Sequence, residues 1–171
     1  MERGLAPSTS IVRMAQFHAI VGLELAVRSF AGGLPLRDAA HAQLLLTFQR
    51  RLHRSWRFAT EVPLPIATDQ RAWDALISLS TCRYGVEVET APRDGQALVR
   101  RLQLKVRDGG VDGVLLVLPA TRRNRDFLSA TGPLLAPLCP VPGARALELL
   151  AAGVDPGGGA IVRLDQKGMA A

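Results

Sequence analysis

Three carboxylates, Asp74, Glu87 and Glu89, are the residues of this sequence whose types and spacing best fit a chemical role. Glu87 and Glu89 are two positions apart, so on a β-strand both side chains point to the same face. Carboxylates crowded in a protein interior resist ionisation unless a hard cation or basic side chains neutralise them. If the strand of Asp74 pairs with the strand of the glutamates, the cluster is suited to hold Mg²⁺ or Mn²⁺, which would activate water and stabilise a phosphoryl transition state.

The segments that carry these acids have the alternation of β-strands. Arg71–Leu79 and Arg83–Thr90 alternate side chains along their length, as does Ser55–Leu64 before them. Three such segments joined by short turns predict an antiparallel meander. In the second segment the pattern places one set of side chains on one face and the other set opposite: Trp73, Ala75 and Ile77 against Ala72, Asp74 and Leu76. We expect Trp73, like Trp56 in the first segment, to be part of the core.

Two amphipathic helices are predicted on either side of the meander, at Leu36–His53 and Arg93–Asp108. Asp38 lies in the first turn of the earlier helix, where a negative charge suits the helix dipole. In the later helix we expect an apolar stripe to pack on the sheet and a basic stripe to face solvent or phosphate: Leu98, Leu102 and Val106 in the first, Arg100 and Arg107 in the second.

The rest of the chain completes an α/β order. The patterns predict a strand at Gly22–Phe30, a strand covered on both sides at Val111–Leu118, helices at about Thr121–Leu135 and Gly143–Ala152, a loop at Asp155–Gly159 and a last strand at Ala160–Leu164. We therefore expect an α/β domain with a mixed central sheet flanked by helices. Its boundaries are residues 21–171, after a flexible N-terminal segment at 1–20.

Composition and charge exclude several classes of protein. The chain has 171 residues, of which 48% are hydrophobic, so it can bury a core. The start of the chain lacks the features of a signal peptide, and no apolar run could span a bilayer. We therefore expect a cytoplasmic protein that does not bind a membrane. Cys82 and Cys139 lack the spacing of a zinc site and are expected as reduced thiols. The net charge of +6 favours phosphate-rich partners, although arginine enrichment from a high-GC genome gives the same bias.

Three stretches together carry a resemblance to a known family. They read EVPLPIATDQRAWDALI, YGVEVET and QALVRRLQLKVRDGGVDGVLLV. With the arrangement of residues 20–165 as a whole, they resemble the nuclease-like domain attached to Cro/repressor-type helix-turn-helix proteins of actinobacteria, a domain of the restriction-endonuclease-like PD-(D/E)xK group. The resemblance implies a metal-dependent site with Asp74 as the first metal-binding acid and Glu87 as the second. Glu61 and Asp38 are accessory acids in the same comparison.

The sequence departs from that family at one position. Glu89 stands two residues after the second acid, where an active member has the lysine that steadies the attacking hydroxide. A glutamate adds negative charge opposite a phosphate, so we expect weak or absent cleavage. The alternative is migration of the positive charge to the following helix, from Lys105 or Arg101, with Gln96 as a polar ligand.

Two functions remain open at this stage. One is a nucleic-acid-associated nuclease-like domain in regulation or defence, degenerate or weakly active, with Arg100, Arg101 and Arg107 binding nucleic acid and a helix-turn-helix protein or a second copy as partner. The other is a non-catalytic protein-interaction or ligand-sensing module, whose acids form a solvated sheet face. His41 lies one turn after Asp38 and either pairs with that carboxylate or packs on the helix surface.

Overall fold

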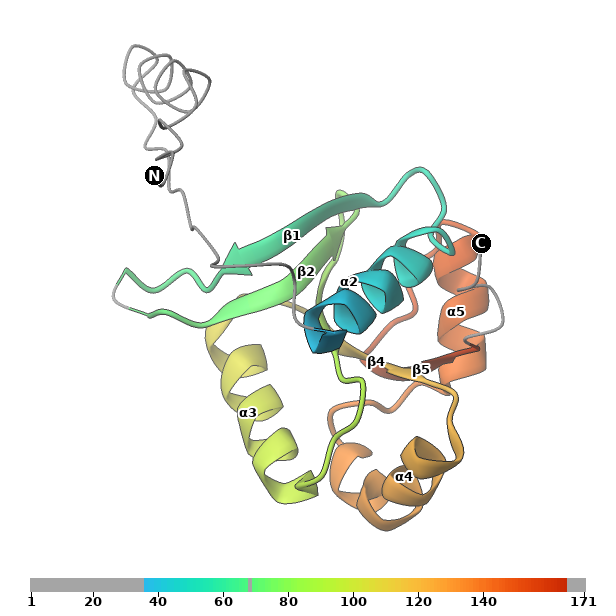
Figure 1. Cartoon of the computed structure of the whole chain (residues 1–171). Helices are drawn as coiled ribbons and strands as arrows, with labels where there is room; N and C mark the ends of the chain where they lie inside the picture. The colour runs from blue at the N-terminus through green and yellow to red at the C-terminus, as the bar shows by residue number, and fades with distance from the viewer. Residues whose placement is uncertain (1–35, 68, 166–171) are drawn as a thin grey trace, which may run out of the picture. The chain divides into compact units, whose positions relative to one another are not determined.

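The computed structural model describes residues 36–67 and 69–165 (Figure 1). Of residues 36–38 it describes the backbone alone. The N-terminal segment 1–20, the predicted strand Gly22–Phe30 and the side chain of Asp38 lie outside the described residues.

One mixed five-stranded sheet organises the described part of the chain. Its strands are β1 (Arg57–Pro63), β2 (Ala72–Ser78), β3 (Arg83–Val88), β4 (Gly113–Pro119) and β5 (Ala160–Leu164). They lie side by side in the order of the chain. β1 pairs with β2 and β2 with β3 in antiparallel fashion, whereas β3 with β4 and β4 with β5 run parallel. The carboxyl ends of β3, β4 and β5 therefore share one edge of the sheet.

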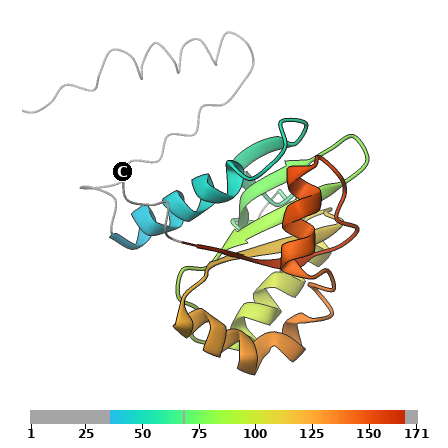
Figure 2. The same ribbon diagram turned by 90° about the vertical axis from the view of Figure 1, so that its right-hand side faces the viewer.

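Helices cover both faces of this sheet (Figures 1 and 2). They are α2 (Leu36–Gln49), α3 (Gly95–Asp108), α4 (Arg122–Leu135) and α5 (Gly143–Ala151). Two separate groups of buried side chains show which helix packs where: Leu44, Phe48 and Leu150 of α2 and α5 in one, and Leu98, Leu102 and Leu135 of α3 and α4 in the other. The mixed α/β class with helices flanking the sheet is as the sequence predicts.

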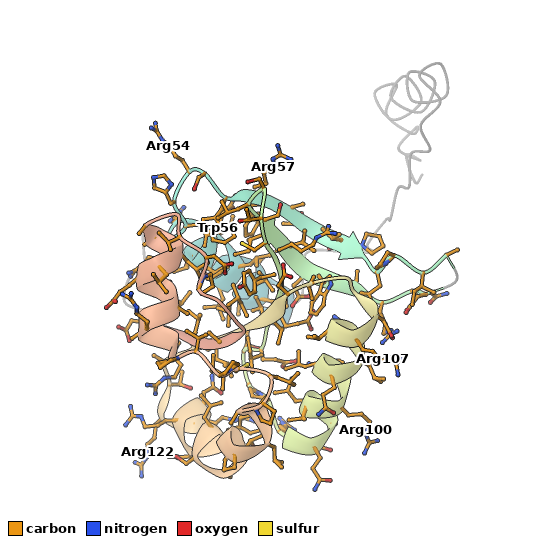
Figure 3. The ribbon with its side chains drawn as sticks, turned by 180° about the vertical axis from the view of Figure 1, so that it is seen from behind. Arg54, Trp56, Arg57, Arg100, Arg107 and Arg122 are labelled. Atoms are coloured by element: carbon orange, nitrogen blue, oxygen red, sulfur yellow. The ribbon has the colours of Figure 1, made fainter. Side chains whose placement is uncertain are left out.

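Helix α3 has the face that its periodicity predicts. It begins after Asp94, whose side-chain oxygen accepts a 2.9 Å hydrogen bond from the Ala97 N–H and caps the first turn. Leu98 and Leu102 are buried, and Val106 packs beside them. The basic stripe faces outward, as Figure 3 shows for its two labelled members, Arg100 and Arg107. Lys105 is buried in addition, which the stripe alone does not indicate.

The predicted alternation of β2 is wrong at Trp73, and this departure shapes the candidate site. Ala75 and Ile77 pack with α2 and α5, but Trp73 packs on the opposite face with α3. The ladder between β2 and β3 ends at the pair Ala75 and Val86, so the backbone is free to turn at Asp74. The Trp73 ring then covers Gly85, where a Cβ would lie 2.5 Å from ring atoms.

Both tryptophans and every residue of β4 are buried, as the sequence predicts. Cys82 and Cys139 are free thiols. No helix in residues 36–67 and 69–165 is long and apolar enough to cross a membrane.

Candidate functional site

A hollow of about 350 Å³ opens where β2 and β3 separate. Asp74 and Glu87, the residues directly beyond the last paired positions, both line it. We call it the fork hollow, and its lining residues are His41, Asp74, Glu87, Val88, Glu89, Thr90, Arg101 and Lys105. The fork lets α2 reach the hollow from one face of the sheet and α3 from the other.

Asp74 is held as a carboxylate by two donors. The backbone N–H of Val88 donates to its Oδ2 atom at 2.7 Å, and Nε2 of His41 lies 3.4 Å from the same oxygen. Burial opposes ionisation of Asp74, but the hydrogen bonds from His41 and Val88 outweigh it and hold its pKa below the usual range. The same hydrogen bond to Asp74 raises the pKa of His41. Asp74 is therefore negatively charged at neutral pH.

Glu87 and Lys105 form a nearly buried ion pair. Their side chains are joined by a 2.5 Å contact between Nζ and Oε1, and the residues are only 4% and 7% exposed. Lys105 also donates to the carbonyl of Ala72 at 2.6 Å and lies 5.4 Å from the ring centre of Trp73. Burial, and after it the charge of Asp74, raise the pKa of Glu87 to about 7, against the opposing effect of Lys105. Glu87 thus exchanges a proton near neutral pH.

A second ion pair lies at the mouth of the fork hollow. Arg101 on α3 pairs with Glu89, and the Arg101 side chain is 45% exposed against 25% for Glu89. Arg101, on the helix that follows β3, therefore offsets part of the charge of Glu89.

The structure brings together some of the predicted site residues and leaves others apart. Asp74, Glu87, Glu89, Arg101 and Lys105 all line the fork hollow. Two predicted residues, Glu61 and Gln96, are exposed and do not line it.

Each of these two absences has a physical reason. Glu61 has a φ of 49°, a left-handed backbone conformation in β1. Gln96 lies nine residues before Lys105 on α3, about 13 Å along the helix axis.

The expected basic residues Arg100 and Arg107 are exposed outside the hollow, and Arg107 pairs with Asp108.

His41 is the site residue whose partner sequence reasoning missed. The sequence predicts either a pair with Asp38 on the same helix or a packing position on the helix surface, but His41 lies at the fork hollow against Asp74. The contact joins His41 on α2 to Asp74 on β2. Residues so far apart in the sequence cannot be paired by rules that use local spacing.

Carboxylates are the groups of the fork hollow that could hold a hard cation such as Mg²⁺ or Mn²⁺. Among the described residues no group of three or more His, Cys, Asp or Glu side chains is placed to hold a metal ion. Mg²⁺ keeps several waters and is usually bound by one or two carboxylates together with substrate phosphate, so two carboxylates such as Asp74 and Glu87 would be enough protein ligands for it. The ammonium of Lys105 already occupies one oxygen of Glu87 and would compete with the cation.

Comparison with known proteins adds little to this geometry. No protein-family model matches the sequence, and no curated protein matches it significantly. Among solved structures the chain is similar to Pyrococcus furiosus SfsA in complex with Ca²⁺, at 17% identity and a TM-score of 0.35. The match covers 75% of this chain and 55% of that one, so the chain spans about half the length of that protein. A likeness of this size establishes no shared fold.

Proposed function

We propose that this chain is a nucleic-acid-associated domain of the restriction-endonuclease-like kind and that its fork hollow hydrolyses phosphodiester bonds with low activity. One observation carries the proposal. Lys105, delivered by α3, reaches the carboxylate of Glu87 at 2.5 Å in a hollow that Asp74 also lines. The lysine that the strand lacks at Glu89 is supplied from the helix.

The residues of the hollow divide the reaction between them. Asp74 and Glu87 would hold Mg²⁺ or Mn²⁺, which when bound supplies Lewis-acid stabilisation of the phosphate and a more acidic water. Lys105 donates hydrogen bonds that hold the attacking water oxygen and offset the charge of the phosphate. The attacking water gives up a proton to solvent as its oxygen bonds to phosphorus, the P–O ester bond breaks, and the leaving oxygen takes a proton from solvent.

Low activity follows from how Lys105 and Glu89 are placed. Lys105 is buried, and two of its three N–H groups already donate to Glu87 and to the Ala72 carbonyl, so one is left for substrate. Glu89 brings a carboxylate to the mouth of the hollow, and Arg101 cancels it only in part because that arginine is half-exposed. A misplaced electrostatic contact of this type commonly costs about 10²–10³ in rate.

Attraction of nucleic acid rests on the basic surface. The net charge is +6, and Arg100 and Arg107 project from α3 on the outside of the domain (Figure 3). Binding driven by phosphate contacts should fall steeply as salt rises. We assign the activity to regulation or defence, with a helix-turn-helix protein or a second copy of this chain as partner, on the resemblance described above.

Cleavage of labelled nucleic acid tests the proposal. We expect the purified protein to cut plasmid or a single-stranded oligonucleotide slowly in Mg²⁺ or Mn²⁺ and not in EDTA. Asp74→Ala should abolish cutting, whereas Asp126→Ala, an exposed acid on α4, should leave it unchanged. Absence of metal-dependent cutting by the wild type, or equal cutting by Asp74→Ala, would contradict the assignment.

One observation favours the non-catalytic alternative. The ion pair of Glu87 with Lys105 already neutralises the buried carboxylate without a metal ion. Thermal unfolding with and without Mn²⁺ separates the two functions, because a cation bound only by the folded state stabilises it by about 2.7 kcal/mol at 100 times its Kd. A melting temperature unmoved by Mn²⁺ would favour an interaction or sensing module.

A further inference from the structure

A second and larger hollow, of about 560 Å³, lies at the far end of the sheet. We call it the edge hollow, and it is lined from four parts of the chain: Ala120 after β4, Arg125, Leu128 and Gly132 of α4, Gly143, Ala144 and Leu147 of α5, and Ile161, Arg163 and Asp165 at β5. Its volume is within the range of roughly 300–1,000 Å³ seen for pockets that enclose small ligands.

The lining of the edge hollow combines cationic and apolar groups. Arg125 and Arg163 are exposed, and neither makes an ion pair with a described residue. Leu128, Leu147 and Ile161 provide apolar surface, and Asp165 is its acidic residue. Two arginines beside an apolar wall suit a ligand with a phosphate at one end and a less polar body.

One buried side chain connects the segments that lead into the two hollows. Thr90 lines the fork hollow and Ala120 lines the edge hollow. The amide of Asn124, which is 1% exposed, donates to the carbonyl of Thr90 at 3.1 Å and to that of Pro119 at 3.0 Å. Both hollows thus lie at the carboxyl ends of parallel strands, which are spaced about 4.8 Å apart. In the sheet, β4 alone separates β3, which leads into the fork hollow, from β5 at the edge hollow.

We propose that the edge hollow binds a neighbouring nucleotide of the same single strand whose phosphodiester enters the fork hollow. Its phosphate pairs with Arg125 and Arg163, and its base or sugar packs on Leu128, Leu147 and Ile161. The inference rests on the proposed function and names its substrate class as unpaired nucleic acid. In a duplex the bases are stacked and paired, so a nucleotide cannot enter an enclosed hollow without being extruded at an energetic cost.

Binding of fluorescein-labelled oligo(dT) of 12 nucleotides to the full chain in EDTA tests this proposal without cleavage. The test variant is Arg125→Ala/Arg163→Ala. The matched control is Arg54→Ala/Arg57→Ala, which removes the same charge from the opposite end of the domain to Arg122, at the start of α4 (Figure 3). Circular dichroism checks that both exposed double variants fold.

We expect the test variant to bind oligo(dT) at least about tenfold more weakly than the wild type, because each arginine gives charge-assisted hydrogen bonds. The slope of log Kobs against log salt should fall by about 1.4, at about 0.7 for each lost phosphate contact on a single strand. The control should bind within about threefold of the wild type, and a duplex of the same length should bind the wild type more weakly than the single strand.

Equal weakening in both double variants, or a duplex bound as tightly as the single strand, would overturn the inference. A parallel cleavage assay in Mn²⁺ separates this failure from failure of the proposed function. If the wild type cuts but the two double variants bind alike, the edge hollow is not a subsite and the fork hollow remains the site. If the wild type neither binds nor cuts, both proposals fall.

Discussion

The ion pair of Glu87 and Lys105 is the most consequential contact at the scale of single residues. Both groups are almost buried, so each depends on the other for compensation of its lost hydration. Glu87 has a pKa of about 7 in the folded protein against 4.5 for the free group. A carboxyl whose pKa is raised on folding contributes most to stability below pH 4.5, and that contribution is lost as the pH rises through 7.

Lys105→Met should therefore destabilise the protein in a pH-dependent way. At pH 8 the variant must either bury the Glu87 carboxylate without its cation or protonate it, which costs up to about 3–5 kcal/mol. At about pH 5 the cost should be smaller, since Glu87 is then protonated in the folded state. Urea unfolding at both pH values measures this. Glu87→Gln/Lys105→Met, which removes both charges, should recover most of the loss at pH 8, and failure to do so would show that packing of the lysine stem dominates.

The contact of His41 with Asp74 makes a second residue-level prediction. The hydrogen bond that His41 donates to Asp74 raises the pKa of the His41 imidazole. The imidazole is therefore protonated over more of the neutral pH range than in the unfolded chain. Its contribution to stability is present below pH 6.5 and lost as the pH rises through the folded pKa. NMR titration should place the midpoint of His41 above 6.5, and Asp74→Asn should lower it. A midpoint unchanged by Asp74→Asn would rule out this pairing.

At the scale of elements, α3 is both a packing element and the carrier of Lys105. Its apolar face fixes the rotation of the helix about its own axis, and that rotation brings Lys105 to Glu87. The fold depends on Leu102 in particular, which is fully buried between α3 and the sheet.

Leu102→Ala should lower the unfolding free energy by about 2–5 kcal/mol, the usual range for removing a buried leucine side chain. Leu104→Ala is the matched control on the same helix. Leu104 is 37% exposed, so its loss should cost less than about 1 kcal/mol. Urea titrations of both variants provide the comparison, and similar costs would mean that the helix face is misassigned.

Local patterns predict most elements of the described fold because each element buries one stripe or face. The helix at Gly95–Asp108 and the strand at Ala160–Leu164 follow from periodicity and from the glycines that bound them. The exception is β2, where strict alternation puts Trp73 beside Ala75. The backbone turns at Asp74 because the pairing of β2 with β3 ends at Ala75. The end of that pairing depends on both strands, so the pattern of β2 alone does not predict it.

At the scale of the whole molecule, the site depends on contacts between distant parts of the chain. The sequence identifies Asp74, Glu87 and Glu89 because strand period and strand order bring them to one place. It leaves open whether Lys105 or Arg101 supplies the missing positive charge, since that choice depends on the rotation and distance of α3. The structure assigns Lys105 to Glu87 and Arg101 to Glu89.

The fork and edge hollows both lie at the carboxyl ends of the parallel strands, and each of them has arginine beside carboxylates. Composition predicts the sign of the partner's charge, but only the sheet order shows that two hollows share an edge.

Exchange of the lysine between helix and strand tests the central claim most directly. The variants are Lys105→Met, Lys105→Met/Glu89→Lys and, as a control at an exposed position of the same helix, Gln103→Met, each confirmed as folded by circular dichroism. The measurement is the rate of Mn²⁺-dependent cutting of a single-stranded oligonucleotide. Lys105→Met should lose about 10²–10³ in rate, because the group that steadies water and phosphate is gone.

The double variant places a lysine at position 89, at the mouth of the same hollow, and should regain at least part of that rate, while Gln103→Met cuts like the wild type. Cutting by Lys105→Met at the wild-type rate would contradict the account, because the helix lysine would then have no part in the reaction.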